Sequence, residues 1–162
     1  MTAPPATKRK RKKPKAKQKP DINLGMLDNL VGFNLRMAQD TSFRIFARRT
    51  GERDIKPGRF AAMMIIHNNP GLTQVELSRA IARDKSSVTP LIQELAHDGL
   101  VARRTSKEDR RSIKLKLTKA GESALSVLLG HATDHDRKLD TIVGGRKLEL
   151  IALLKKIAAE LS

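Results

Sequence analysis

Residues 72–118 read LTQVELSRAIARDKSSVTPLIQELAHDGLVARRTSKEDRRSIKLKLT and decide the fold of this 162-residue chain. Two short helical patterns joined by a tight turn come first, and a strand, a charged tip at 107–111 and a second strand follow. In the second strand Ile113, Leu115 and Leu117 alternate with lysines, so we expect one face to be buried and the other to be cationic. This order predicts a winged helix-turn-helix within a fold that is mainly α with a small β-wing.

The ends of the two helices are marked by specific residues. A Thr-x-x-Glu capping box at 73–76 indicates the start of the first helix. The second helix contains Pro90, which is tolerated only in a first turn, because proline lacks the amide proton and clashes with the preceding turn. We therefore expect this helix to begin near Ser86 or Ser87, either of which is a good N-cap. Gly99 is placed to end it.

The exposed side of the second helix and the hairpin tip carry the candidate DNA contacts. Hydroxyl, amide and ammonium groups can bond base edges or phosphates in a major groove, although each of these residues could equally be part of a solvated helix face. Arginines at the tip are suited to a narrow minor groove, and an aspartate beside them could hold one in position. The candidates are Lys85, Ser86, Ser87, Thr89, Pro90, Gln93, Arg103, Asp109, Arg110 and Arg111.

Composition narrows the class of protein. The chain has 33 Lys and Arg against 17 Asp and Glu, a net charge of +16, which attracts phosphate, anionic membranes or acidic proteins. It has no cysteine, which excludes disulfides, thiolate metal sites and cysteine nucleophiles. No apolar run is long enough for a membrane span, so we expect a cytoplasmic protein without a membrane partner. None of the histidines falls in a recognisable catalytic spacing, so we expect no enzyme activity.

The charge divides the chain into two parts. Residues 1–20 hold nine Lys and Arg, four prolines and no acid, and such a segment cannot form a core, so we expect a disordered basic tail. The tail could supply nonspecific phosphate contacts or serve only as a solubilising extension. Residues 21–162 hold 24 basic and 17 acidic groups, a net charge of +7, so this part is basic by itself.

Helical patterns flank the predicted winged domain at 57–118. One runs from 24 to about 49 with an apolar face, and the winged domain after it opens with a helix at Pro57, which suits a first turn. The last helix carries an apolar stripe too large to leave in water, so its partner is expected to be a second subunit. That stripe consists of Leu148, Ile151, Leu154, Ala158 and Leu161. We assign 24–50 and 119–162 to dimerisation.

The sequence blocks of the predicted winged domain resemble the MarR family of bacterial transcriptional regulators. The most specific element is the Asp-x-Arg signature at Asp109 and Arg111, followed by a strand ending in Leu117 and Thr118. The other matching blocks are Leu72-Thr73-Gln74, Leu77-Ser78, 85–92, Leu95, 99–101 and Gly121. The resemblance implies a homodimer of triangular outline with interleaved terminal helices, and a twofold dimer would read an inverted-repeat operator.

The resemblance also implies a repressor relieved by a small ligand, bound between the dimerisation helices and the winged domain. Our preferred ligand is an anionic aromatic compound, for example a coenzyme A thioester of an aromatic acid. The candidate apolar wall is Phe33, Met37, Phe60, Met63 and Met64, and the candidate cations are Arg36, Arg44 and Arg59. Each of these residues could instead be ordinary core or surface.

No metal site or cofactor is expected. His131 and His135 are four residues apart on a predicted helix and are weak candidates for sharing a metal ion, but histidines on an exposed helix are usually only surface.

Three functions are compatible with the sequence. A ligand-responsive, sequence-specific regulator of double-stranded DNA agrees with the helix-turn-helix, the wing and the dimer helices. An architectural DNA-binding protein with little sequence preference agrees with the tail and the net charge. A single-strand or RNA binder is disfavoured, because a chain with four Phe and no Tyr or Trp lacks a stacking platform.

Overall fold

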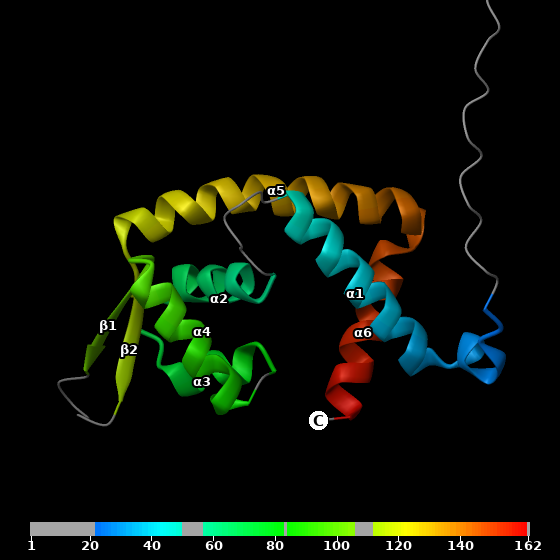
Figure 1. Ribbon diagram of the computed structural model, residues 1–162, viewed down its shortest axis with the longest axis horizontal. Coiled ribbons are helices and arrows are strands. Elements are labelled where there is room, and N and C mark those ends of the chain that lie inside the picture. The colour runs from blue at the N-terminus through cyan, green and yellow to red at the C-terminus, as the bar shows by residue number, and fades with distance from the viewer. Residues whose placement is uncertain (1–21, 50–56, 83, 106–111, 162) are drawn as a thin grey trace, which may run out of the picture.

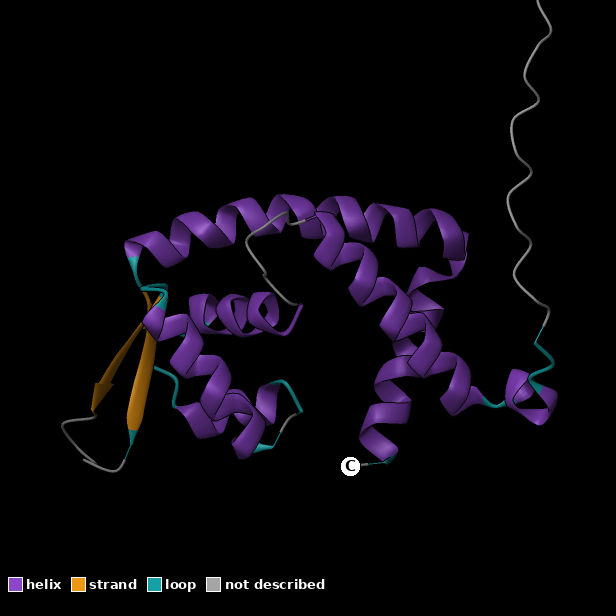
Figure 2. Cartoon of the chain, in the orientation of Figure 1, coloured by secondary structure: helices purple, strands orange, loops and turns teal. Residues whose placement is uncertain are grey.

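The computed structural model describes residues 22–49, 57–82, 84–105 and 112–161. These residues are mostly helical with one antiparallel hairpin, which confirms the predicted fold class (Figure 2). The helices are η1 (Gly25–Asn29), α1 (Val31–Arg49), α2 (Pro57–Asn68), α3 (Gln74–Ala80), α4 (Lys85–His97), α5 (Lys119–Val143), η2 (Gly144–Arg146) and α6 (Lys147–Glu160), and the strands are β1 (Val101–Thr105) and β2 (Ile113–Leu117).

The long helix α5 connects two groups of elements (Figure 1). In this view α5 runs along the top, with α2, α3, α4 and the hairpin below one end and α1 and α6 below the other. We call the first group, 57–128, the reading half. The second group, 22–49 together with 132–161, is the terminal half.

The hydrophobic core lies in the reading half. Its members come from α2, α3, α4, both strands and the first turns of α5, and most of them have no exposed surface. They are Ala62, Met63, Ile66, Leu77, Val88, Ile92, Leu95, Val101, Leu115, Leu117, Leu125 and Leu128. Burial of this apolar set fixes how α4 and the wing lie relative to each other.

The hairpin has the predicted position and one additional partner. Its register pairs Val101 with Leu117 and Thr105 with Ile113. On its other edge, β2 bonds the segment before α3: Leu115 accepts from the Gly71 amide and donates to the Leu72 carbonyl, each at 2.9 Å. The buried strand of the wing is therefore hydrogen-bonded on both sides.

The start of α4 differs from the prediction, because Asp84 and not Ser86 or Ser87 is the N-cap. The Asp84 carbonyl accepts from the amides of Ser87 (2.9 Å) and Val88 (3.2 Å), so helical geometry begins earlier. Pro90 consequently lies beyond the first turn, where it cannot donate to the carbonyl of Ser86.

The end of α4 agrees with the prediction. Gly99 has φ +69°, its amide donates to Ala96 (3.0 Å), and the Leu100 amide donates to Leu95 (2.9 Å). These two bonds form a Schellman motif, in which a glycine takes the left-handed position.

The first helical pattern is also divided differently from the prediction. In place of one helix from 24 to 49, η1 ends at Asn29, Leu30 is extended with ψ 124°, and α1 follows. The side-chain amide of Asn34 donates to the carbonyls of Asp28 (2.8 Å) and Leu30 (2.9 Å). Asn34 thus bonds carbonyls at the break, which stabilises the interruption.

The terminal half leaves its apolar side chains uncovered within one chain. No described residue of α6 is buried, and Leu148 and Leu161 are 80% and 83% exposed. Along α1, only Phe46 is buried among the residues whose side chains are described. None of the described helices combines the length and apolar composition that crossing a bilayer requires.

Candidate functional site

Helix α4 presents its polar residues on the side opposite the core. Val88, Ile92 and Leu95 are fully buried, which holds this helix against α2, α3 and the hairpin. The predicted contacts that the structure leaves exposed on α4 are Lys85, Ser86, Ser87, Pro90 and Gln93. Pro90 and Gln93 are both exposed and lie about one helical turn apart, so they share a face of α4 that is available to base edges.

Thr89 differs from these residues, because its hydroxyl is already bonded on two sides. Its Oγ1 donates to the Lys85 carbonyl at 2.9 Å and accepts from Nε2 of Gln74 at 2.6 Å. Sequence reasoning missed Gln74, which is the first residue of α3. Periodicity places Gln74 at a helix start but does not indicate which residue of the next helix it meets.

The wing adds a cationic face beside α4. Paired residues on an antiparallel hairpin point to the same side, so Arg104 shares a face with Lys114, and Lys116 lies on that face opposite Ala102. The predicted contact Arg103 is exposed but lies on the other face, opposite Leu115. Which of the neighbouring residues Arg103 and Arg104 shares a face with Lys114 depends on the register, which the sequence does not show, and the role of Arg103 stays a prediction.

The remaining predicted DNA contacts lie outside the described residues. These are Asp109, Arg110 and Arg111 at the wing tip, and the same holds for the basic tail at 1–20. Their roles stay predictions.

The capping box at the start of α3 has the predicted geometry. The Thr73 amide donates to Oε2 of Glu76 at 2.6 Å, and the Glu76 amide donates to the Thr73 hydroxyl at 3.3 Å. The bond from the Thr73 amide, helped by the Thr73 hydroxyl and by Arg79 and Lys114, lowers the pKa of Glu76. Thr73 also forms a β-bridge with Lys114, which ties the start of α3 to the wing.

A cavity of about 630 Å³ lies where the two halves meet. Phe46 packs against Phe60 with ring centroids 5.9 Å apart, and the ring of His135 meets Phe46 edge-on at 5.8 Å. The polar side is formed by Ser42, whose Oγ lies 2.8 Å from Nε2 of His135. The lining consists of Gln39, Ser42, Phe43 and Phe46 from α1, Gly58, Phe60 and Ala61 from α2, Ile81, and Ala132, Thr133, His135 and Asp136 from α5.

Of the eight predicted ligand-binding residues, all of which the structure describes, only Phe60 lines this cavity. Met63 is fully buried in the core, and Met64 packs against that core. Arg59 forms an ion pair with Asp98 at the C-cap of α4, away from the lining.

The other predicted ligand-binding residues lie along α1. Arg36 lies over the ring of Phe33, 5.5 Å from its centroid, and pairs with Asp40 at 3.3 Å. Met37 and Arg44 are exposed. Of the lining residues that sequence reasoning did not select, four come from α1 and four from α5, and those of α5 lie more than 70 positions further along the chain than Phe60.

His131 and His135 lie about one turn apart on α5, but no third possible ligand joins them among the described residues. The ring of His135 is engaged with Ser42 and Phe46, and across the described residues no three His, Asp and Glu side chains gather as a metal site would require.

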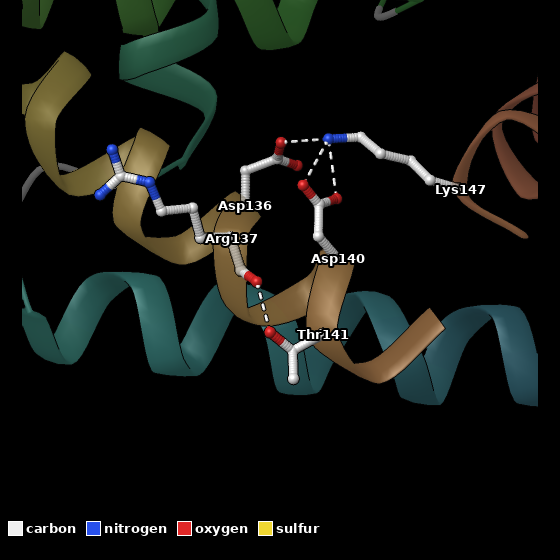
Figure 3. Close-up of polar contacts among 5 residues, drawn as sticks. All are labelled: Asp136, Arg137, Asp140, Thr141 and Lys147. Atoms are coloured by element: carbon white, nitrogen blue, oxygen red, sulfur yellow. Dashed lines mark hydrogen bonds and ion pairs between the residues drawn. The ribbon is translucent and has the colours of Figure 1, made fainter. Parts of the chain in front are cut away.

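Asp136 links the cavity to the last helix (Figure 3). Nζ of Lys147, at the start of α6, lies 2.7 Å from Asp136 and 2.7 Å from Asp140, while the hydroxyl of Thr141 donates to the Arg137 carbonyl at 3.0 Å. The hydrogen bond to Asp136, followed by the one to Asp140, raises the pKa of Lys147. A side chain of the cavity wall is thus held by the element that carries the exposed apolar stripe.

Comparison with known proteins agrees with this geometry. The family model described as MarR family matches residues 55–113. A protein of Thauera aromatica, whose name assigns it to transcriptional regulation of the hcr operon, is 34% identical over 135 residues, covering 82% of this chain and 81% of the relative.

Solved structures show the same fold. The transcriptional repressor CouR bound to a 23-mer DNA duplex superposes with a TM-score of 0.78 at 28% identity, covering 85% of this chain and 99% of that one. CouR bound to p-coumaroyl-CoA gives a TM-score of 0.76 at 25% identity, covering 85% and 98%.

Proposed function

Because the chain belongs to the MarR family of transcriptional regulators, we propose that it is a homodimeric repressor released from its operator by an aromatic acyl ligand. The observation that carries this proposal is the cavity between the two halves. Residues of α1, α2 and α5 line it together, so a ligand there touches both the terminal helices and the reading half.

DNA binding is supported by the exposed polar side of α4 beside the cationic face of the wing. The relative CouR has been solved on a DNA duplex, which favours the same use of this surface here. A twofold dimer presents two copies of α4, so the expected operator is an inverted repeat with half-site centres about one helical turn apart or slightly more.

The ligand class follows from the cavity wall. Three phenylalanines, Phe43, Phe46 and Phe60, offer faces and edges to an aromatic ring, and Ser42 with His135 offers hydrogen bonds at one side. Among the described lining residues the charged side chain is the anion Asp136, so an anionic portion of the ligand belongs outside this part of the cavity.

A coenzyme A thioester of an aromatic acid meets both requirements. Its acyl ring would occupy the apolar wall, while the phosphates of its carrier would lie outside this part of the cavity. The relative CouR has been solved with p-coumaroyl-CoA, which supports this class of compound.

Release from DNA would follow from the different shapes of the free and ligand-bound dimers. A ligand lowers operator affinity only by its preference for the shape in which the two reading helices are wrongly spaced. Arg59 is well placed to respond, because its neighbours in sequence, Gly58 and Phe60, line the cavity while its own side chain pairs with Asp98 at the end of α4.

The test is a footprint of the full chain on DNA upstream of its own gene, with excess nonspecific competitor. We expect a protected inverted repeat that p-coumaroyl-CoA abolishes, while p-coumarate and free coenzyme A act weakly. Phe43→Ala should reduce the response to p-coumaroyl-CoA, and Val127→Ala, an exposed residue of α5 outside both the lining and the terminal half, is the control. A protected repeat that none of the three compounds affects would refute the ligand assignment.

The second candidate is an architectural DNA-binding protein, favoured by the nine cations of residues 1–20 and the net charge of +16. It predicts diffuse protection that competitor removes, in place of a defined repeat.

A further inference from the structure

We propose that Gln74 is a positioning residue of the DNA-reading helix: it holds Thr89, and with it the first turns of α4, in the register that sets base preference. Its role rests on the proposed sequence-specific operator binding. Direct base contacts are left to the exposed residues around Thr89.

The hydrogen-bond inventory fixes the direction of the Gln74–Thr89 contact. A threonine hydroxyl has one proton, and Thr89 donates that proton to the Lys85 carbonyl at 2.9 Å. Gln74 must therefore be the donor in the 2.6 Å contact, with its amide nitrogen toward Thr89. The reverse amide orientation would bring two acceptors together, which is unfavourable in this partly buried place.

Gln74 extends from a well-anchored base. It directly follows Thr73, whose amide and hydroxyl are both held by Glu76 and which is bridged to Lys114 of β2. The start of α3 is thereby tied to the wing. A bond from this point to α4 transmits the position of the wing to the reading helix.

The part of α4 that receives the bond needs such support. Pro90 removes the amide that would donate to Ser86, and a threonine hydroxyl bonded to the carbonyl four residues back bends helices. The first two turns of α4 are therefore less constrained by their own backbone than an ordinary helix. The Gln74 amide supplies a constraint from the neighbouring helix.

The consequence for recognition is specific. The hydroxyl proton of Thr89 is committed to Lys85, so Thr89 cannot donate to a base without giving up that bond. Base preference near this residue then depends on where the exposed Ser86 and Gln93 lie, and the Gln74–Thr89 bond controls that placement.

The test is a double-mutant cycle read out as base preference. Duplexes are first selected from a random library with the unaltered full chain, and Gln74→Ala, Thr89→Val and the double variant are then profiled on the same pool at one salt concentration. We expect each single variant to lose about 2- to 12-fold in affinity, the range for one net hydrogen bond, and to change preference at the same base pairs. The double variant should lose no more affinity than the single variant that binds more weakly, because both substitutions remove the same bond.

Two controls separate positioning from a purely structural role. Thr89→Ser keeps the hydroxyl and should restore the profile of the unaltered chain, while Gln93→Ala, an exposed residue, should relax preference at its own base pair only. Additive losses in the double variant would overturn the proposal, as would Thr89→Val relaxing one base pair while Gln74→Ala changes none. Failure of the unaltered chain to enrich any sequence would instead refute sequence-specific binding itself.

Discussion

The two halves of the molecule treat their apolar side chains in opposite ways. In the reading half, residues such as Met63, Ile92 and Leu115 are fully buried by elements of the same chain. In the terminal half, α6 carries leucines along its length and buries none of them within the described chain. Since both halves are apolar in sequence, apolarity alone does not tell which one completes its own core.

This contrast indicates how the protein is assembled. The reading half can close its core in a single chain, whereas the terminal half requires a second surface of similar composition. A second copy of the chain supplies that surface in the proposed dimer. Stability of the two halves should therefore depend differently on protein concentration.

The largest effect is expected from placing charges on the terminal half. Leu148→Glu with Leu161→Glu alters two side chains that are 80% and 83% exposed, so the single chain has room for the charges. A dimer interface cannot accommodate these charges, because it would have to bury them without partners. We expect monomers in sedimentation and an operator affinity lower by about 10²- to 10⁴-fold, since linked half-site binding is lost.

Lys156→Glu is the matched control, because it changes the charge of an exposed α6 residue whose pair with Glu160 is a 3.8 Å surface contact. If the double variant sediments as the unaltered chain does, the terminal half does not form the dimer interface.

Truncation within the core of the reading half should give the next effect. Leu95 is fully buried, so Leu95→Ala is expected to cost about 2 to 5 kcal/mol of unfolding free energy at any protein concentration. Leu150 in α6 has a side chain that is 40% exposed. Leu150→Ala should instead lower the part of the unfolding free energy that depends on protein concentration. Urea unfolding at two concentrations distinguishes them, and equal behaviour of the two variants would contradict the division into halves.

Two glycines of α5 provide a smaller and sharper comparison. A Cβ at Gly121 would collide with the backbone carbonyl of Leu100, so Gly121→Ala should destabilise the protein by about 1 to 3 kcal/mol. A Cβ at Gly130 meets nothing within 4 Å, and Gly130→Ala should stabilise by up to about 1 kcal/mol through helix propensity. Thermal unfolding of both variants is the measurement. A neutral Gly121→Ala would mean that α5 is not tightly seated on the end of α4.

The smallest effects concern pH and differ between the halves. Bonds from Thr73 hold the pKa of Glu76 below 4.5, so this group stabilises the reading half above pH 4.5, and the stabilisation is lost as the pH falls through the lowered pKa. Bonds to Asp136 and Asp140 hold the pKa of Lys147 above 10.5, so its contribution is present below pH 10.5 and is lost as the pH rises through the raised pKa.

Stability measured against pH at low salt checks both groups. Glu76→Gln should flatten only the acid limb of the curve and Lys147→Met only the alkaline limb. Added salt should reduce both differences, because the groups are exposed. If Glu76→Gln leaves the acid limb unchanged, the Glu76 carboxylate of the capping box does not contribute to the pH dependence of stability.

Local signals in the sequence predicted local structure well. The capping box at Thr73, the helix end at Gly99 and the alternating strand of the wing all appear where their residues place them. The predicted start of α4 was wrong. We expected Pro90 to lie in the first turn, but the Asp84 carbonyl accepts the first helical hydrogen bonds, so the helix begins earlier.

The parts that could not be predicted depend on distant pairings. The cavity wall contributed by His135 requires knowing which face of α5 meets α1, and the same apolar spacing is compatible with several faces. The Gln74–Thr89 bond requires the crossing of α3 and α4. Arg59, expected at a ligand, is paired with Asp98, which is 39 positions away in sequence.

The unbroken course of α5 has a consequence for how this chain can change over evolutionary time. Its 25 residues span about 37 Å and carry core residues first, cavity residues next and the partners of Lys147 last. One inserted residue between Leu128 and Ala132 would turn everything after it by about 100° and advance it by about 1.5 Å. We therefore expect lineages of this protein to vary in the identity of exposed α5 residues but to conserve its length, and to accept insertions instead at the glycines of η2.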